Sequence, residues 1–192
     1  MISICVSLMN RGDNFKRLYE TITRISDKEL VVADYGSDDI DLSMYNCKVV
    51  ELSLPFRRSA ALNAAFDASS GDKVFFCDAD MLLPAHLRTV MDEKVAPGQC
   101  YFPVCFSLYQ GKPPVVNKDN GWWRSTGFGM CGFTREDFIR CGKWPEQFVK
   151  HGGEDDFLFA KAKKTLKVSR SNLEGLFHQW HDNDLQFKNR YY

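Results

Sequence analysis

Short apolar runs alternate with helix-patterned segments through residues 1–83, and this alternation limits the possible folds more than any other feature of the sequence. Runs rich in Val, Ile and Phe span 2–8, 29–34, 47–52 and 73–77. Apolar residues at helical spacing follow the first run, and an alanine-rich helix is predicted at 59–68. Such alternation favours right-handed crossovers between the strands of a mostly parallel sheet. We therefore predict an α/β fold with helices on both faces of a central sheet.

The remainder of the chain, residues 84–192, has a less regular pattern. The spacing of apolar residues predicts helices at 85–94, 135–141 and 154–166. We expect a strand at 101–108, a loop at 110–121 and a hydrophobic stretch with glycines at 126–133. A length of 192 residues suffices for one substantial core and is short for two. We therefore predict a single domain over residues 1–192, which can be the N-terminal module of a longer protein.

The composition argues against several classes of protein. The 25 basic and 25 acidic side chains give a formal net charge of zero, so no nucleic-acid partner is expected. No apolar run approaches roughly 18 residues, so no membrane span is expected, and the N-terminus lacks the basic start of a signal peptide. The seven cysteines are odd in number and form no CxxC pair. We expect free thiols in a reducing compartment, and hence a cytoplasmic location.

Polar clusters follow three of the predicted strands. They are Asn10-Arg11, the segment 34–38 that begins with Asp34-Tyr35, and Asp78-Ala79-Asp80. Ligands of parallel α/β sheets bind beyond the carboxyl ends of the strands, so the clusters predict one binding edge. The carboxylates of Asp78 and Asp80 can both turn toward one hard cation, which prefers oxygen ligands. For an isolated Asp-x-Asp triplet, a solvated turn is the alternative.

The segment 151–156 combines two glycines with three acids in the order His-Gly-Gly-Glu-Asp-Asp. Glycines allow a sharp turn and a close approach of the backbone to a ligand. One of the carboxylates that follow can take the proton of an attacking sugar hydroxyl. Capping of the predicted helix by its acids is the alternative explanation.

Histidine and tryptophan side chains supply two further candidate groups. His178 and His181 lie three residues apart on either side of Trp180, and an imidazole nitrogen can complete a manganese-type site. A structural role for both histidines is the alternative. Trp122 and Trp123 offer flat faces on which sugar rings can stack, with core packing as the alternative. For Trp144, which precedes a proline, we expect core packing.

Taken in order, these segments resemble inverting glycosyltransferases of the GT-A type, and especially the galactosyltransferase and chondroitin-polymerase branch. The resemblance covers most of the chain. It rests on Met9-Asn10-Arg11, on 34–38, on 56–63 (similar to FNRAxxLN), on 78–80, on Gly129-Met130-Cys131-Gly132-Phe133 and on Gly152-Gly153-Glu154-Asp155-Asp156. It implies the GT-A fold, which is Rossmann-like, with a nucleotide-binding half at 1–83 and an acceptor-binding half at 84–192.

The resemblance also implies roles for individual residues. Contacts to the nucleotide sugar are expected from Asn10, Arg11, Asp34, Tyr35, Arg58, Asn63, Asp78 and Ala79. A Mn²⁺ or Mg²⁺ ion is expected at Asp78 and Asp80, with His178 or His181 as a further ligand. Asp155 is implied as the catalytic base and Glu154 as a second catalytic residue that contacts the acceptor. Further acceptor contacts are expected from Trp122, Trp123, His151, Gly152 and Asp156. Galactosyltransferases carry Trp where this chain has His151, so the resemblance does not extend to the identity of the acceptor or of the donor sugar.

These features together predict a metal-dependent, inverting hexosyltransferase. It would move a sugar from a UDP-sugar to a hydroxyl of a glycan acceptor by a single in-line displacement. Two alternatives remain open at this point: a sugar nucleotidyltransferase, which would share the fold, and a non-catalytic carbohydrate-binding domain, which would need no metal site.

Overall fold

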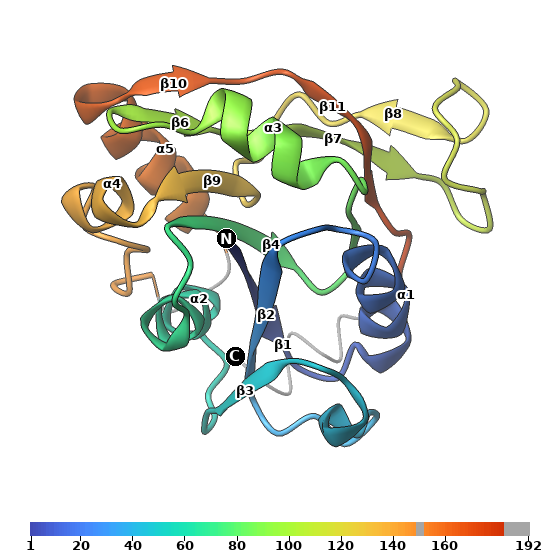
Figure 1. Cartoon of the computed structure of the whole chain (residues 1–192). Helices are drawn as coiled ribbons and strands as arrows, with labels where there is room; N and C mark the ends of the chain where they lie inside the picture. Colours follow the sequence, from blue (N-terminus) through green and yellow to red (C-terminus); the bar gives the residue numbers. More distant parts are fainter. Residues whose placement is uncertain (149–151, 183–192) are drawn as a thin grey trace.

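The computed structural model describes residues 1–148 and 152–182, so the predicted acceptor contact His151 lies outside the described residues. Its largest element is a seven-stranded sheet with the strand order β10-β6-β9-β4-β1-β2-β3 (Figure 1). The strands are β1 (Ile2–Leu8), β2 (Lys28–Asp34), β3 (Lys48–Glu51), β4 (Lys73–Asp78), β6 (Gln99–Tyr101), β9 (Cys131–Thr134) and β10 (Lys167–Ser169). All neighbours pair in parallel except β9, which is antiparallel to β4 and β6. The predicted mostly parallel sheet is therefore confirmed.

Helices cover both faces of this sheet, as the alternation of elements predicted. They are α1 (Gly12–Ile22), α2 (Arg58–Ala68), α3 (Leu87–Lys94), α4 (Arg135–Arg140) and α5 (Glu154–Thr165), with a short 3₁₀ helix at Leu42–Met44. Apolar side chains of α1 and α3 pack on one face, and those of α2, α4 and α5 pack on the other. Figure 1 shows α1 and α2 on opposite sides of β1 and β2. Two buried layers therefore hold the sheet, with Phe15 in one and Phe66 in the other.

A second sheet of four strands, not predicted from the sequence, lies beside the first. Its order is β5-β11-β7-β8, with β5 (Met81–Leu82), β7 (Val104–Leu108), β8 (Gly121–Trp123) and β11 (Asn172–His178). The single strand predicted at 101–108 is wrong, because β6 belongs to the first sheet and β7 to the second. Pro103 separates the two strands and has no N–H for a ladder, which explains the break.

Most of the other elements predicted for residues 84–192 are present. Its three predicted helices correspond to α3, α4 and α5, and the hydrophobic stretch at 126–133 leads into β9. All seven cysteines are free thiols, as expected, and six of them are buried, Cys47 being partly exposed. Among the described residues, no helix combines the length and the apolar character needed to cross a bilayer.

Candidate active site

The polar clusters that follow β1, β2 and β4 meet at one edge of the large sheet. Leu8 pairs with Asp34, and Ser7 pairs with Asp78, so the three strands end at the same level. The loops after β1 and β2 are joined by two hydrogen bonds. The Asn10 amide donates to Ser37 Oγ (3.0 Å), and the Asp38 amide donates to Asn10 Oδ1 (3.0 Å). This edge is the binding edge that parallel α/β sheets generally offer.

Asp34 and Tyr35 shape the loop that follows β2. The Asp34 carboxylate is buried and accepts hydrogen bonds from the amide and the hydroxyl of Ser37. The Tyr35 hydroxyl donates to the Arg57 carbonyl (3.2 Å), and burial raises its pKa. Both predicted nucleotide contacts therefore also order the loops around the edge of the sheet.

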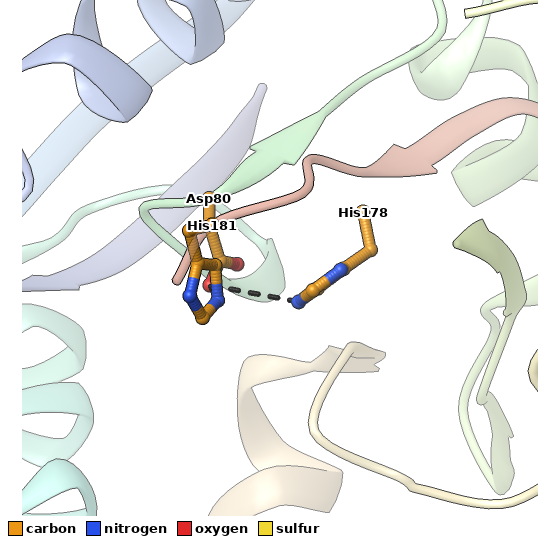
Figure 2. A group of neighbouring side chains, drawn as sticks. All are labelled: Asp80, His178 and His181. Carbon is orange, nitrogen blue, oxygen red and sulfur yellow. Dashed lines mark ion pairs between the residues drawn. The ribbon is translucent and has the colours of Figure 1, made fainter. Parts of the chain in front are cut away.

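Asp80, His178 and His181 form a cluster that can hold a metal ion. One ligand atom from each residue lies within 4.8 Å of the other two. The Nε2 atoms of His178 and His181 lie 3.6 Å and 3.0 Å from Asp80 Oδ2. Figure 2 shows the His178 ring aimed at the Asp80 carboxylate. The other carboxylate oxygen, Asp80 Oδ1, is buried and has no hydrogen-bond partner among residues 1–148 and 152–182.

The pairing of β11 with β5 brings the two histidines to Asp80. Asp80 lies in the turn between β4 and β5, and His178 at the end of β11 pairs with Met81 of β5. The next residue, Gln179, is fully buried and was not predicted to belong to the site. Its amide donates to the Asp80 carbonyl (2.8 Å), and its side chain donates to the carbonyls of Asn14 (3.0 Å) and Met81 (3.2 Å). Gln179 thereby fixes the turn that carries Asp80.

The three side chains affect one another's ionisation. Burial opposes the charged form of Asp80, but the hydrogen bond from His181 and the nearby positive charges lower the net pKa of this carboxyl. The same hydrogen bond to Asp80 raises the pKa of His181, while burial lowers the pKa of His178. The His181 Nδ1 atom contacts the Asp182 carbonyl (3.0 Å), which favours a proton on Nδ1, so Nε2 can bind a metal ion once it loses the proton that it donates to Asp80.

Asp78, which was also predicted as a metal ligand, pairs instead with Arg58. Arg58 Nε donates to Asp78 Oδ1 at 2.6 Å, and Arg58 Nη2 donates to the Gly129 carbonyl at 2.9 Å. Although burial opposes its charge, neighbouring acids raise the pKa of Arg58, and Asp78 is the largest of them. Asp78 is not part of the cluster formed by Asp80 and the histidines.

The acids that begin α5 lie on the other side of Arg58. Arg58 Nη1 lies 4.0 Å from the buried Glu154 carboxylate, which accepts a hydrogen bond from the Gly152 amide (2.9 Å). Asp155 Oδ2 accepts a hydrogen bond from the Phe128 amide (2.9 Å). Gly152 and Gly153 have φ angles of 110° and 91°, which an L side chain rarely adopts. The glycines thus lie in the turn from which Glu154 faces Arg58 and Asp155 lines the same pocket.

A pocket of about 160 Å³ joins these groups. Its lining includes the predicted residues Arg58, Asp78, Gly152, Glu154 and Asp155, together with Pro103, Cys105, Arg124, Thr126, Gly127, Gly129 and Met130. Arg124 is a cation that the sequence did not single out, because it lies in a segment with no recognisable pattern. Asp78 lines the pocket and lies two residues before Asp80, so the pocket and the metal-binding cluster are neighbours.

Several residues that the sequence singled out contact other parts of the protein. Asn63 is buried, and its amide bonds the backbone N–H (3.1 Å) and carbonyl (3.0 Å) of Trp144 and the Glu146 carboxylate (2.7 Å). Ala79 is part of the apolar core. Arg11 precedes α1, and its charge helps to lower the pKa of Asp80. Trp144 is buried in the core, which confirms the prediction for this residue.

The adjacent tryptophans face opposite sides of β8. Trp122 is 47% exposed and lies against Tyr109, with ring centroids 5.2 Å apart. Trp123 packs edge-on against Phe106 in the small cluster beneath the second sheet. Trp122 therefore offers a face to a ligand, whereas Trp123 is mainly a packing residue. Asp156, another predicted acceptor contact, is exposed on the first turn of α5.

The sequence matches one family over nearly its whole length. Residues 2–189 match the model described as chondroitin N-acetylgalactosaminyltransferase. The human chondroitin sulfate N-acetylgalactosaminyltransferase 2 is 30% identical over 95% of this chain and 40% of its own length. The human chondroitin sulfate N-acetylgalactosaminyltransferase 1 is 28% identical over 95% of this chain and 41% of its own length. The chain thus spans less than half of the length of these curated relatives.

Solved structures show the same fold. TarS from S. aureus has a TM-score of 0.72 and 18% identity, covering 93% of this chain and 60% of that chain. A TarS structure in complex with UDP-GlcNAc has a TM-score of 0.71 and 14% sequence identity, and the match covers 95% of this chain and 59% of that chain. The mannosyltransferase PcManGT from Pyrobaculum calidifontis, in complex with GDP-Man and Mn²⁺, has a TM-score of 0.64 and 16% sequence identity. The match covers 95% of this chain and 58% of that chain. These likenesses confirm the predicted GT-A fold.

Proposed function

The chain belongs to the chondroitin N-acetylgalactosaminyltransferase family, and we propose that it catalyses the metal-dependent transfer of a sugar from a UDP-sugar to a hydroxyl of a glycan acceptor. The transfer would invert the configuration at the anomeric carbon. The observation that carries this proposal is the cluster of Asp80, His178 and His181 beside a pocket lined by Arg58 and Asp155. The cluster and the pocket supply the groups that a leaving diphosphate and an attacking hydroxyl need.

The cluster fits a divalent cation by its chemistry and by its geometry. One carboxylate and two imidazoles are a ligand set that first-row divalent metals accept, Mn²⁺ among them. The buried Asp80 Oδ1, which no described residue hydrogen-bonds, is an acceptor that an ion would satisfy. When bound, such an ion supplies Lewis-acid stabilisation of the negative charge that develops on the departing diphosphate. The choice between Mn²⁺ and Mg²⁺ remains a prediction.

Arg58 would bind a phosphate oxygen of the donor. Its Nε and Nη2 atoms are occupied by Asp78 and Gly129, whereas Nη1 is buried and donates no hydrogen bond to the described residues. Guanidinium groups recognise phosphate strongly because they donate charge-assisted hydrogen bonds in a fixed geometry. In this arrangement Asp78 would orient Arg58 for the donor, and Asp80 alone of the two aspartates would hold the cation.

Asp155 would act as the base. Its carboxylate lines the pocket and keeps lone pairs beyond those that accept the amides of Phe128 and Asp156. As the acceptor oxygen attacks the anomeric carbon from the face opposite the diphosphate, its proton passes to Asp155. The bond from the anomeric carbon to the diphosphate breaks, and the electron pair leaves with UDP. Glu154, held by Gly152, faces the same pocket and would contact the acceptor.

The family suggests the sugar and the kind of acceptor. Because the relatives are named as N-acetylgalactosaminyltransferases of chondroitin sulfate, we propose N-acetylgalactosamine as the sugar transferred and a glycan chain as the acceptor. A groove lined by Arg17, Tyr109, Lys112 and Trp180, among others, offers aromatic faces near the histidines. The exposed ring of Trp122 lies against Tyr109 and extends this aromatic surface.

Release of UDP from UDP-N-acetylgalactosamine in the presence of Mn²⁺, with and without glycan acceptors, tests the proposal. We expect Asp80→Asn to lose both Mn²⁺-dependent UDP binding and transfer. Asp155→Asn should keep UDP binding but lose about a hundredfold or more of the transfer rate, since general bases contribute on that order. Asp72→Asn, whose side chain is 92% exposed, is the control and should behave as the wild type.

Two results would contradict the proposed function. Full transfer activity in both Asp80→Asn and Asp155→Asn would show that neither residue has the assigned role. Release of pyrophosphate from a sugar phosphate and a nucleoside triphosphate, in place of UDP release, would identify a nucleotidyltransferase instead.

A further inference from the structure

The loop formed by residues 125–128 touches α5 at two points, and one of them is the proposed base. The Phe128 amide donates to Asp155 Oδ2 at 2.9 Å. The Phe128 ring stacks on Phe159, with centroids 3.8 Å apart and an interplanar angle of 11°. Asp155 and Phe159 are four residues apart on the helix, so both contacts lie on one face of α5. The position of Phe128 therefore fixes one of the two hydrogen bonds that orient the Asp155 carboxylate.

Arg170 holds the same loop from the opposite side. Arg170 lies between β10 and β11, and its Nη2 atom donates to the carbonyls of Ser125 (2.7 Å) and Gly127 (3.1 Å). Its guanidinium carbon lies 4.4 Å from the centroid of the Phe128 ring. The ring is thus held between the guanidinium of Arg170 and Phe159. A planar guanidinium can donate and stack at the same time, which an ammonium group cannot do.

Arg170 is partly buried, and one of its nitrogens lacks a partner among the described residues. Burial lowers the pKa of Arg170, and its Nη1 atom is buried with no hydrogen-bond partner in the described part of the chain. Arg170 as a whole is only partly buried, but a guanidinium nitrogen that is buried without a partner is disfavoured unless the remaining contacts compensate. Within residues 1–148 and 152–182, the contacts of Arg170 that compensate are those to the loop at 125–128.

We infer that Arg170 is a positioning residue for the proposed reaction, which holds the loop at 125–128 so that the Phe128 amide orients the Asp155 carboxylate toward the acceptor hydroxyl. The inference rests on the proposed function, since it assumes that Asp155 is the base. It assigns to Arg170 no contact with the substrate. Misplacement of a reacting group by about 1 Å can cost on the order of a hundredfold in rate.

Replacement of Arg170 should therefore affect catalysis without affecting the binding of the nucleotide. We expect Arg170→Ala to lower kcat for transfer by about tenfold to a hundredfold, with the Kd for UDP and Mn²⁺ within about twofold of the wild type. Arg170→Lys should restore only part of the rate, because lysine cannot both bridge two carbonyls and stack on Phe128. Guanidinium ions added to Arg170→Ala should raise kcat, since they can occupy the space of the missing group.

Arg88→Ala is the matched control. Arg88 also donates two hydrogen bonds, to Asp27 (2.7 Å) and Asp92 (2.8 Å), but on α3 and outside the pocket. We expect this variant to keep the kcat of the wild type and to show no response to guanidinium ions. A loss of stability alone would affect both variants, whereas rescue by guanidinium is specific to the contact of Arg170 with the loop.

Hydrogen exchange of the Phe128 amide provides a readout that does not depend on activity. We expect this amide to exchange at least about tenfold faster in Arg170→Ala than in the wild type and in Arg88→Ala, because its hydrogen bond to Asp155 opens more often. Unchanged exchange at Phe128, or an unchanged kcat in an enzyme in which Asp155→Asn is inactive, would overturn the inference. Normal transfer by Asp155→Asn would contradict the proposed base instead, and the exchange measurement would still decide whether Arg170 holds the loop.

Discussion

Asp78 and Asp80 are separated by one residue, yet they have different partners. Asp78 Oδ1 accepts a hydrogen bond from Arg58 (2.6 Å), whereas Asp80 Oδ2 lies 3.0 Å from His181. Asp78 is the last residue of β4 and lines the pocket, whereas Asp80 lies in the turn that follows, next to the pairing of β5 with β11. A pair of acids that looks like one ligand set in sequence can therefore serve two parts of the same donor, the phosphates through Arg58 and the cation directly.

The pH dependence of metal binding follows from the ionisation of His181. The hydrogen bond to Asp80 raises the pKa of His181 above its ordinary value of 6.5, and a protonated imidazole cannot bind a metal ion. The pKa of Asp80 is lowered, so this carboxylate stays ionised near neutral pH. We predict that the affinity for Mn²⁺ rises by about tenfold per pH unit until the pH passes the pKa of His181, and then levels off.

Electron paramagnetic resonance of free Mn²⁺, measured without nucleotide, checks this prediction. His181→Gln should bind Mn²⁺ more weakly and lose the part of the pH dependence that lies above pH 6.5. Without metal the sign is opposite: the raised pKa of His181 stabilises the folded protein at low pH, and this stabilisation fades as the pH rises through that pKa. Identical pH profiles for the wild type and His181→Gln would contradict the assignment.

For single residues, the sequence indicated which side chains could bind a metal ion better than it indicated which atoms a side chain contacts. Asp80 and the histidines could be found because their residue types limit what they can do. The partners of Asn63 could not, because they are atoms of Trp144 and Glu146 that only the tertiary fold brings near. Arg170 gave no signal for the same reason, since its partners lie in a distant loop.

Among the elements, β11 brings the histidines to Asp80. It pairs with β5 and β7, and its end carries His178 next to the turn that holds Asp80. The strands of the first half were predictable because long apolar runs have few alternative structures in water. The strands β5, β10 and β11 were not predicted, since β5 and β10 have two and three residues and β11 contains Gly175 with a positive φ of 85°.

The turn that begins α5 tests whether backbone geometry sets the position of the base. Gly153 has a φ of 91°, and a Cβ atom there would lie 3.1 Å from the Phe148 ring. Gly98 has a φ of 80° with open space around it, in a turn that contributes no residue to the pocket. Alanine at either position should cost about 1–2 kcal/mol of stability because of the left-handed backbone, or a few degrees in Tm.

We predict that Gly153→Ala also loses at least about tenfold in kcat, because the shift at Phe148 moves Glu154 and Asp155 at the start of the helix. Gly98→Ala should lose stability but keep its kcat. Thermal unfolding and steady-state kinetics of the two variants check the prediction. Equal kcat values in both variants would show that the turn does not position the base.

Across the whole molecule, the site joins parts of the chain that are distant in sequence. The cation cluster takes Asp80 from the predicted nucleotide-binding half and His178 and His181 from the predicted acceptor-binding half. The pocket likewise combines Arg58 of α2 with Asp155 of α5. The mostly parallel α/β sheet could be predicted because the alternation of strands and helices is local, and the resemblance to known glycosyltransferases implied the GT-A type. The second sheet depends on pairings between distant strands. The division into halves and the cytoplasmic location stay predictions.

The central claim is that Asp80, His178 and His181 hold the cation that meets the diphosphate of the donor. Anomalous X-ray diffraction from crystals grown with Mn²⁺ and UDP tests it most directly, because manganese is located independently of the protein model. We predict one strong peak within about 2–2.5 Å of the Asp80 carboxylate and of at least one of the two imidazoles, with a phosphate oxygen of UDP as a further ligand. A peak elsewhere, with UDP bound and all three side chains away from the ion, would contradict the claim.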